Sequence, residues 1–303
     1  MRNAYLAALY ELAKVDKNVL ALISDNGAIV YDKFRADFPN QYMNFGIAEA
    51  NMIAAAAGMA SRGKIPFAYT IGAFLAYRAL EFIRNDVCYQ RQNVKIVGTG
   101  AGFAYANLGA THHATEDISI LRAMPNLTLF SPASPLEVKK VVQAAYKIDG
   151  PVYIRIGTNK EPEIYERDYD FTVGKAVTLR DGRDLTLMST GSVAADVLKA
   201  ADELTAVGYS VRVLNFPTIK PLDEEAIRQA AEETGYIVTV EEHSIYGGFG
   251  GAVAEVLAES GIGAKFRRVG LRDFAQGYGT HGEVAAANGL GARGIVKVVS
   301  KIL

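Results

Sequence analysis

Cysteine is nearly missing from this sequence, because Cys88 is the only one among 303 residues. A single thiol cannot build a framework of intrachain disulfides, so we expect a protein of the reducing cytoplasm. Cys88 itself lies in a mixed, helix-like segment, and we interpret it as a packing residue rather than a nucleophile.

Strong charge and long apolar runs are missing as well. The formal net charge is −1 and no block of basic residues occurs, which argues against a nucleic-acid partner. No apolar run reaches the length of a membrane span, and no charged segment followed by an apolar one opens the chain. We therefore predict neither a membrane partner nor a signal peptide.

Half of the residues are hydrophobic, and the length suggests two domains with sizeable cores. Short apolar runs alternate with helix-like segments along most of the chain, which is typical of parallel sheets covered by helices. We predict an α/β protein with two doubly wound, mostly parallel-sheet domains. The predicted division is residues 1–160, a linker at 161–183 with some edge strand, and residues 184–303.

The last strand predicted in the first domain is 152–156, and we expect it to close the sheet of that domain. A helix is expected from Phe74 through Ile83, and Asp223 is expected to cap another. The strands predicted from apolar runs are 19–24, 65–69, 94–98, 127–130, 152–156, 185–189, 211–215, 236–241 and 266–270.

One carboxylate, Glu49, stands in an otherwise apolar stretch of small residues. The alanines and methionines that follow it predict a buried helix with Glu49 in its first turn. A buried Glu needs a partner, so Glu49 is a candidate for a site. The alternative is a solvent-facing Glu that interacts favourably with the helix dipole.

Asp25 follows the apolar run 19–24 directly. Open α/β sheets bind their ligands at the carboxyl ends of strands, so Asp25 is a second candidate. A helix cap or a turn remains the alternative for this residue.

The segment Gly46-Ile47-Ala48-Glu49, with the small-residue helix after it, resembles the catalytic-glutamate segment of the transketolase family of thiamine-diphosphate enzymes. Further matches occur in the family's order and spacing, and the resemblance is to the C-terminal half of a transketolase. These matches are Asp25, Gly109-Ala110-Thr111-His112, Met124-Pro125-Asn126-Leu127, and Glu241-Glu242-His243 before Gly247-Gly248.

The resemblance implies a pyrimidine-binding domain followed by a transketolase C-terminal domain, with thiamine diphosphate as cofactor. Glu49 would hydrogen-bond the aminopyrimidine ring of the cofactor, which carries the difficult chemistry at its thiazolium ring. Phe74 would stack on the aminopyrimidine, with Tyr77 and Tyr69 beside it and Asp25 near the cofactor. Ordinary core packing is the alternative for these three aromatic residues.

His112 matches the family histidine that faces the cofactor and the donor carbonyl, so it is a candidate catalytic and substrate-binding residue. His113 has no family counterpart and is expected behind His112, near the substrate. We expect His243 and His281 to be structural or interfacial.

The resemblance also shows what this sequence lacks. The family binds the diphosphate and its divalent metal in an N-terminal domain, and no such segment occurs here, so no metal ligand is predicted in this chain. We expect Mg²⁺ or Ca²⁺ on an N-terminal transketolase subunit, within an α2β2 assembly.

The sugar-phosphate positions depart from the family pattern. Arg2 matches one phosphate-binding arginine, whereas the second is replaced by Thr158 with Lys160 close by. Leu108 stands where the family has an aspartate, and Gly100 where it has a histidine. We therefore expect a substrate other than the standard pentose phosphates.

Together these features predict the C-terminal subunit of a split transketolase, which transfers a two-carbon ketol unit between sugar phosphates or related sugars. The alternatives are a 1-deoxyxylulose-5-phosphate-synthase-like subunit, a 2-oxo acid dehydrogenase E1 β-like subunit and a non-catalytic partner. An unrelated nucleotide-binding protein is less supported, because no dinucleotide fingerprint follows any strand.

Overall fold

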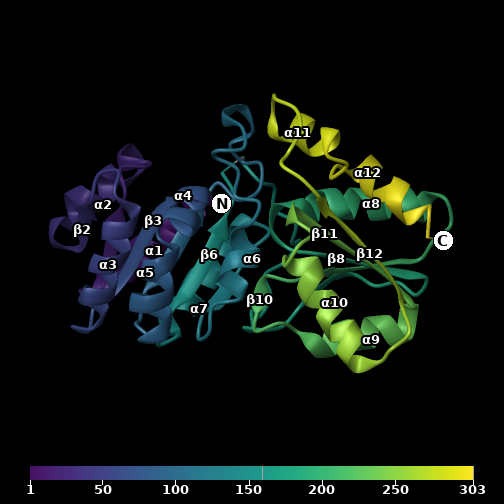
Figure 1. Ribbon diagram of the computed structural model, residues 1–303, viewed down its shortest axis with the longest axis horizontal. Coiled ribbons are helices and arrows are strands. Elements are labelled where there is room, and N and C mark those ends of the chain that lie inside the picture. The colour runs from purple at the N-terminus through teal and green to yellow at the C-terminus, as the bar shows by residue number, and fades with distance from the viewer. Residues whose placement is uncertain (159, 303) are drawn as a thin grey trace.

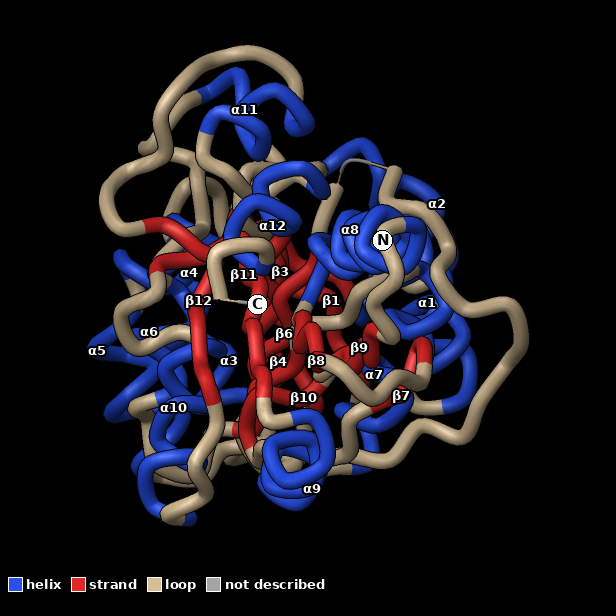
Figure 2. Tube along the Cα trace, turned by 90° about the vertical axis from the view of Figure 1, so that its right-hand side faces the viewer, coloured by secondary structure: helices blue, strands red, loops and turns tan. Residues whose placement is uncertain are grey.

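The computed structural model describes residues 1–158 and 160–302, and these form two α/β domains side by side (Figure 1). The first domain, coloured purple to teal, is organised around a seven-stranded sheet, and the second, green to yellow, around a five-stranded one. Seen along the long axis, the strands occupy the centre and the helices surround them (Figure 2). The predicted fold class is confirmed.

The first sheet has the order β10-β5-β6-β4-β3-β1-β2, with every pairing parallel except that of β10 with β5. From β1 the chain first adds β2 on one side and then β3 on the other, so the direction of strand addition reverses between β1 and β3. In open α/β sheets a ligand-binding crevice is expected outside the carboxyl ends of two such strands. The strands are β1 (Val19–Ile23), β2 (Tyr42–Asn44), β3 (Ile65–Ile71), β4 (Lys95–Thr99), β5 (Thr128–Phe130), β6 (Val152–Ile156) and β10 (Thr218–Lys220).

Two expectations about the first domain need correction. β6 does not close the sheet but lies between β4 and β5, and the edge is formed by β10, a three-residue strand from the second half of the chain. The helix expected from Phe74 to Ile83 is broken at Ala79, whose φ of −101° and ψ of 11° are not helical. Its parts are α4 (Gly72–Arg78), α5 (Leu80–Phe82) and a π-helical segment η3 (Ile83–Tyr89).

The second sheet has the order β12-β11-β8-β9-β7, and only the edge strand β7 is antiparallel. β7 lies within the segment that we predicted as a linker with some edge strand. The strands are β7 (Val177–Arg180), β8 (Leu185–Ser189), β9 (Val211–Asn215), β11 (Tyr236–Ser244) and β12 (Lys265–Leu271).

Helices cover the sheets, and α7 (Pro135–Lys147) and α8 (Ala194–Ala206), for example, each bury an apolar face. Asp223 caps α9 as expected, by accepting a hydrogen bond from the backbone N–H of Ala226 at 3.2 Å. The remaining helices are α1 (Arg2–Val15), α2 (Asp32–Asp37), α3 (Glu49–Ala60), α6 (Asp117–Arg122), α7 (Pro135–Lys147), α8 (Ala194–Ala206), α9 (Glu224–Thr234), α10 (Phe249–Ser260), α11 (His281–Ala287) and α12 (Ala292–Val299).

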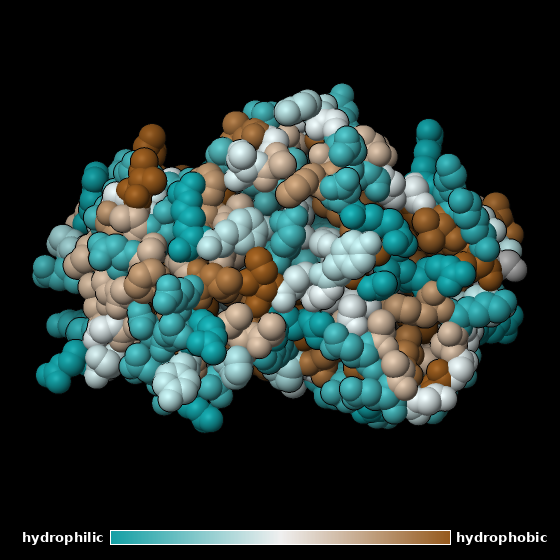
Figure 3. Space-filling view, in the orientation of Figure 1, coloured by the Kyte–Doolittle hydropathy of each residue, from teal (hydrophilic) through white to brown (hydrophobic). Residues whose placement is uncertain are grey.

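None of the helices within residues 1–158 and 160–302 combines the length and the hydrophobicity needed to cross a membrane. Exposed hydrophobic groups are instead scattered in separate patches over both domains on the face shown in Figure 3. Scattered exposed apolar groups of this kind are normal on a folded protein.

Candidate active site

The turn before Glu49 is built at the carboxyl ends of β1 and β2. Asn44 Oδ1 accepts hydrogen bonds from the backbone N–H groups of Asp25 (3.1 Å) and Gly46 (2.9 Å), and Asn44 Nδ2 donates to Asp25 Oδ1 (3.1 Å). Asp25 and Gly46 both have positive φ angles, 54° and 68°. Asp25 thus shapes the turn that sets Glu49 at the start of α3.

Ser24 holds the same turn from the other side. Its hydroxyl donates to the carbonyl of Gly46 (2.7 Å) and accepts from the backbone N–H of Ala48 (3.0 Å). These bonds fix the backbone on either side of Ile47, whose side chain is 78% exposed. The turn is therefore rigid while its apolar tip faces outward.

Glu49 is the first residue of α3 and is only 4% exposed. Its two carboxylate oxygens each lie 3.3 Å from Arg78 Nη1, and the Arg78 side chain is 50% exposed. A carboxylate at a helix N-terminus is also stabilised by the unpaired N–H groups there. Glu49 is thus the buried, partnered carboxylate that the sequence suggested, rather than a solvent-facing one.

Phe74, on α4, lies beside this ion pair. The guanidinium carbon of Arg78 is 4.1 Å from the centroid of the Phe74 ring, and the His112 ring meets Phe74 edge-on at 5.0 Å. The structure therefore brings Glu49, Phe74 and His112 together from three separate segments. Arg78 was missed by the sequence analysis, although its position four residues after Phe74 places it on the same helix face.

The two tyrosines expected near Phe74 lie in different places. The Tyr77 hydroxyl donates to Glu116 Oε2 at 2.6 Å, and burial together with the nearby carboxylates raises the pKa of Tyr77. Tyr69 is fully buried in β3 and stacks on Tyr5 with a centroid distance of 5.5 Å. Burial raises the pKa of Tyr69 to about 12. Tyr69 thus belongs to an aromatic core next to the site.

The glycine-rich loop after β4 carries both adjacent histidines. His112 is half-buried and its Nδ1 lies 3.0 Å from Thr111 Oγ1. His113 is buried against the Phe103 ring at 5.7 Å, and this burial lowers the pKa of His113. His112 therefore faces the Glu49 side of the loop, whereas His113 packs behind it.

Tyr105 is a second residue that the sequence analysis missed. A Cβ atom at Gly100, which has a φ of +83°, would lie 2.1 Å from a carbon of the Tyr105 ring. The same ring lies 6.4 Å from the ring of His112. Tyr105 thus fills the space beside Gly100, the position at which the family has a histidine. The only sequence signal for Tyr105 was its place in the glycine-rich loop.

Arg2 and Lys160 lie on segments that meet at the end of β6. The backbone N–H of Gly157 donates to Met1 Sδ at 3.4 Å, and the α-amino group of Met1 lies 3.0 Å from Glu161 Oε2. Arg2 Nε is buried and has no hydrogen-bond partner in residues 1–158 and 160–302. Lys160 is exposed.

The second domain also contacts the glycine-rich loop, through Glu242 at the end of β11. Glu242 accepts from the backbone N–H of Phe103 (3.4 Å) and lies 2.7 Å from His281 Nε2. Burial alone would lower the pKa of His281, but the Glu242 carboxylate outweighs it and the net shift is upward. Glu242 and His281 thus support the loop that presents His112.

His243 is fully buried where the two domains meet. Asp117 on α6 and Arg155 on β6 form a buried ion pair beside it, with Arg155 Nε 3.0 Å from Asp117 Oδ2. Arg155 also donates to the carbonyl groups of Ala114 and Glu242, at 2.8 and 2.9 Å. This network joins the second sheet to the strand and loop that carry the candidate site.

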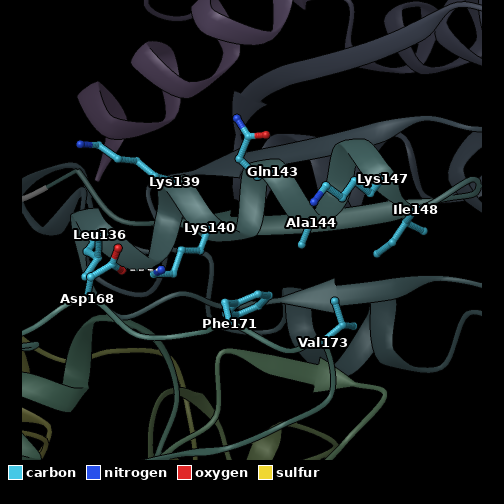
Figure 4. Close-up of a pocket in the computed structure, with 10 residues that line it drawn as sticks. All are labelled: Leu136, Lys139, Lys140, Gln143, Ala144, Lys147, Ile148, Asp168, Phe171 and Val173. Carbon is cyan, nitrogen blue, oxygen red and sulfur yellow. Dashed lines mark ion pairs between the residues drawn. The ribbon is translucent and has the colours of Figure 1, made fainter.

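A groove of about 560 Å³ runs along α7, away from the candidate site (Figure 4). Lys140 and Asp168 pair across it at 2.5 Å, and Phe171 and Val173 lie on the side opposite the helix. None of the predicted site residues lines this groove. In the part of the chain that the structure describes, no group of three His, Cys, Asp or Glu residues is arranged to hold a metal ion.

Residues 1–161 match the family described as transketolase, pyrimidine binding domain, and residues 174–295 match the family described as transketolase, C-terminal domain.

Two curated relatives cover nearly the whole chain. The chain is 39% identical over 298 residues to an apulose-4-phosphate transketolase subunit of Phocaeicola vulgatus, covering 98% of this chain and 95% of that protein. It is 38% identical over 303 residues to the 6-deoxy-6-sulfo-D-fructose transketolase subunit SqwH of a Clostridium species, covering 100% and 94%. A solved structure described as a split gene transketolase, inactive beta4 tetramer, superposes with a TM-score of 0.90 at 39% identity, covering 100% of this chain and 97% of that one.

Proposed function

The chain belongs to the transketolase family, and on this basis we propose that it is the C-terminal subunit of a split transketolase that uses thiamine diphosphate. In this proposal the chain binds the pyrimidine side of the cofactor. An N-terminal subunit supplies the diphosphate site and its Mg²⁺ or Ca²⁺, in an α2β2 assembly. The complex transfers a two-carbon ketol unit between sugar phosphates or related sugars.

The observation that carries the proposal is the trio of Glu49, Phe74 and Arg78. A buried carboxylate and an aromatic face together hold a planar, nitrogen-rich group here, namely the guanidinium of Arg78. An aminopyrimidine ring is also planar and can hydrogen-bond a carboxyl group while it stacks on an aromatic ring. The residues present therefore fit the pyrimidine half of thiamine diphosphate.

The bound cofactor would supply the electron sink for cleavage of a carbon–carbon bond. Glu49 would share a proton with the pyrimidine ring nitrogen, and burial favours this because it keeps water away from the carboxyl group. Phe74 would orient the ring by stacking. His112, at the edge of Phe74, would hydrogen-bond the oxygen of the substrate that gains negative charge.

Exposed apolar side chains beside the site support a partner subunit. The apolar side chains of Ile47 (78% exposed) and Leu108 (48% exposed) face outward next to the site. Both relatives described above are named as subunits, and each matches over almost its full length. Because both are named as transketolase subunits, a subunit resembling 1-deoxyxylulose-5-phosphate synthase or a 2-oxo acid dehydrogenase E1 β chain is less supported. The presence of Glu49, Phe74 and His112 argues against a non-catalytic role.

The substrate proposed is a sugar other than the standard pentose phosphates. Leu108 and Gly100 offer no polar side chain, and Arg2 is the one retained phosphate-binding candidate, with Lys160 on the adjoining segment. Two relatives are named for apulose 4-phosphate and for 6-deoxy-6-sulfo-D-fructose, which supports a branched, deoxy or differently charged sugar here.

Replacement of Glu49 tests the proposed function. In the complex with the N-terminal subunit, Glu49→Ala should slow exchange of the thiazolium C2 proton of bound cofactor by about a hundredfold or more, because the acid contact to the ring is lost. Proton NMR of quenched samples in D2O measures this exchange.

The isolated chain is the control for the partner's role. It should bind thiamine diphosphate and Mg²⁺ weakly or not at all in calorimetry, because the diphosphate and metal site is proposed to lie on the N-terminal subunit. Tight stoichiometric binding by the free chain, or exchange in Glu49→Ala within a few-fold of wild type, would contradict the proposal.

A further inference from the structure

Arg78 occupies the two contacts that the proposed pyrimidine site offers. Its guanidinium stacks on Phe74 at 4.1 Å and lies 3.3 Å from both oxygens of Glu49. We propose that Arg78 is a placeholder, a side chain that keeps the pyrimidine site closed in the free chain and leaves when the cofactor ring enters. This inference rests on the proposed function and adds a regulatory residue to the same site.

The Arg78 guanidinium and the aminopyrimidine ring of the cofactor can make the same two contacts. A guanidinium and an aminopyrimidine both present a flat face to an aromatic ring, and both can hydrogen-bond Glu49. The guanidinium donates an N–H group to the carboxylate, whereas the pyrimidine ring nitrogen would share a proton with the carboxyl group. One face of Phe74 and one buried carboxylate cannot serve both groups at once. Binding of the cofactor ring and the Arg78 contacts are therefore mutually exclusive.

The contacts of Arg78 are suited to release. Only one of its terminal nitrogens reaches Glu49, so the pair lacks the two parallel hydrogen bonds of a strong Arg–carboxylate fork. Half of the side chain is exposed, so it can move into solvent without crossing the core. Arg78 is also the last residue of α4, immediately before the break at Ala79.

Glu49 needs a partner in the free chain, and a placeholder supplies one. A buried carboxylate without a partner costs free energy, and Glu49 is 4% exposed. Arg78 satisfies this group until the cofactor arrives, so the turn and α3 stay folded in the free chain. The partner subunit would then favour exchange, because a cofactor anchored by its diphosphate brings the ring to the site at high local concentration.

The competing explanation is that the Arg78–Glu49 ion pair only stabilises the packing of α3 against α4 and persists when the ligand binds. In that case Arg78 does not compete with the ligand, and removing it should not tighten binding. If the open state makes up about a tenth to a third of the free chain, removing Arg78 should tighten pyrimidine binding by about three- to tenfold.

The test is a titration of the full chain with 4-amino-5-hydroxymethyl-2-methylpyrimidine, the pyrimidine half of thiamine, at up to millimolar concentration and observed by NMR. Arg78→Met keeps the length of the side chain and removes the charge, and Arg78→Gln retains a hydrogen bond to Glu49 in case the first variant folds poorly. Arg84→Met is the matched control, because Arg84 is an exposed arginine six residues later that donates to Asn85.

If Arg78 is a placeholder, the Arg78 variants should bind the pyrimidine three- to tenfold more tightly, and Arg84→Met should bind it as the wild type does. In the wild-type chain, the Arg78 Nε–H signal should shift as the ligand is added. Equal or weaker binding by both Arg78 variants, with binding still lost in Phe74→Ala and Glu49→Gln, would overturn the placeholder alone. Binding that is insensitive to Phe74→Ala and Glu49→Gln would overturn the proposed function as well.

Discussion

At the scale of single residues, Gly100, Tyr105 and Leu108 shape what we propose to be the substrate end of the site. The Tyr105 ring lies where a side chain at Gly100 would point, so a larger residue at position 100 would force that ring to move. Leu108 ends a short 3-10 segment, Ala106–Leu108, and is half-exposed. An apolar residue at this position leaves no buried polar group unpaired when a donor lacks a hydroxyl.

The substrate proposal follows from this surface. In the reconstituted complex, a panel of donors and acceptors should give a higher kcat/KM for a branched, deoxy or differently charged sugar than for xylulose 5-phosphate and ribose 5-phosphate.

Leu108→Asp is the matched variant. It should raise kcat/KM for hydroxylated donors relative to deoxy donors by about tenfold or more, since a hydrogen bond to a charged group contributes about 1.5–3 kcal/mol. The substrate proposal fails if the standard pentose phosphates are the best substrates of the wild-type complex.

At the scale of elements, the end of β11 caps the start of α6. His243 Nε2 accepts hydrogen bonds from the backbone N–H groups of Ile118 (3.1 Å) and Ser119 (3.4 Å), and its Nδ1 lies 2.8 Å from the carbonyl of Ser244. A carbonyl only accepts, so Nδ1 carries the proton and the ring is neutral. Burial lowers the pKa of His243 from 6.5 to about 4.

This geometry predicts that His243 contributes a loss of stability in mild acid. Buried Glu241, 3.7 Å from His243 Nδ1, contributes in the opposite direction because burial raises its pKa to about 7. Between pH 6.5 and about 4 the unfolded chain binds a proton at His243 and the folded chain does not, so the contribution of His243 to the free energy of unfolding falls as the pH falls. The full effect is on the order of 3 kcal/mol. In urea unfolding at pH 7.5, 6 and 5, the wild type should lose more stability with falling pH, or gain less, than His243→Gln does.

His281 provides the control for this prediction, because the pKa of His281 is raised. Its contribution to stability is fully present below pH 6.5 and is lost as the pH rises through the raised value. His281→Gln should therefore lower stability at pH 5 to 6 but leave the slope between pH 6 and pH 5 in place. An acid slope that is the same in His243→Gln and in the wild type would refute the assignment.

At the scale of the whole molecule, the two domains share structure and do not merely touch. β10, which follows the second domain's β9, pairs with β5 at the edge of the first sheet. The buried rings of Phe216 and Phe249, 5.1 Å apart, belong to one hydrophobic cluster with Ile118 and Leu129 of the first domain. A core that crosses the boundary couples the stability of the two domains.

We therefore expect one unfolding transition for the whole chain. In calorimetry, Phe216→Ala should lower the midpoint of that single transition, with a loss of about 3–5 kcal/mol, because it leaves a cavity in the shared core. Phe274→Ala, at a site that is 64% exposed, is the control and should change stability by no more than about 0.5 kcal/mol. Two separate transitions, only one of them shifted by Phe216→Ala, would contradict this coupling.

The sequence by itself determined the elements that local pattern controls. Continuous apolar runs predicted β1, β3, β4 and β6, because strands buried on both faces need hydrophobic side chains on both faces. The cap at Asp223 and the carboxylate at the start of α3 could also be read from residue type and neighbours. The family resemblance added the grouping of Glu49, Phe74 and His112, which no local pattern contains.

Only the tertiary structure decided what depends on pairing through space. β2 and β10 are three-residue strands that contain polar residues and no continuous apolar run, so only their pairing with β1 and β5 identifies them. Likewise, residue type alone leaves Arg78 a surface arginine and Tyr105 a loop aromatic. The roles proposed for them depend on the carboxyl ends of parallel strands, which bring distant segments to one edge of the sheet. There Glu49 is buried and Arg78 lies close enough to pair with it.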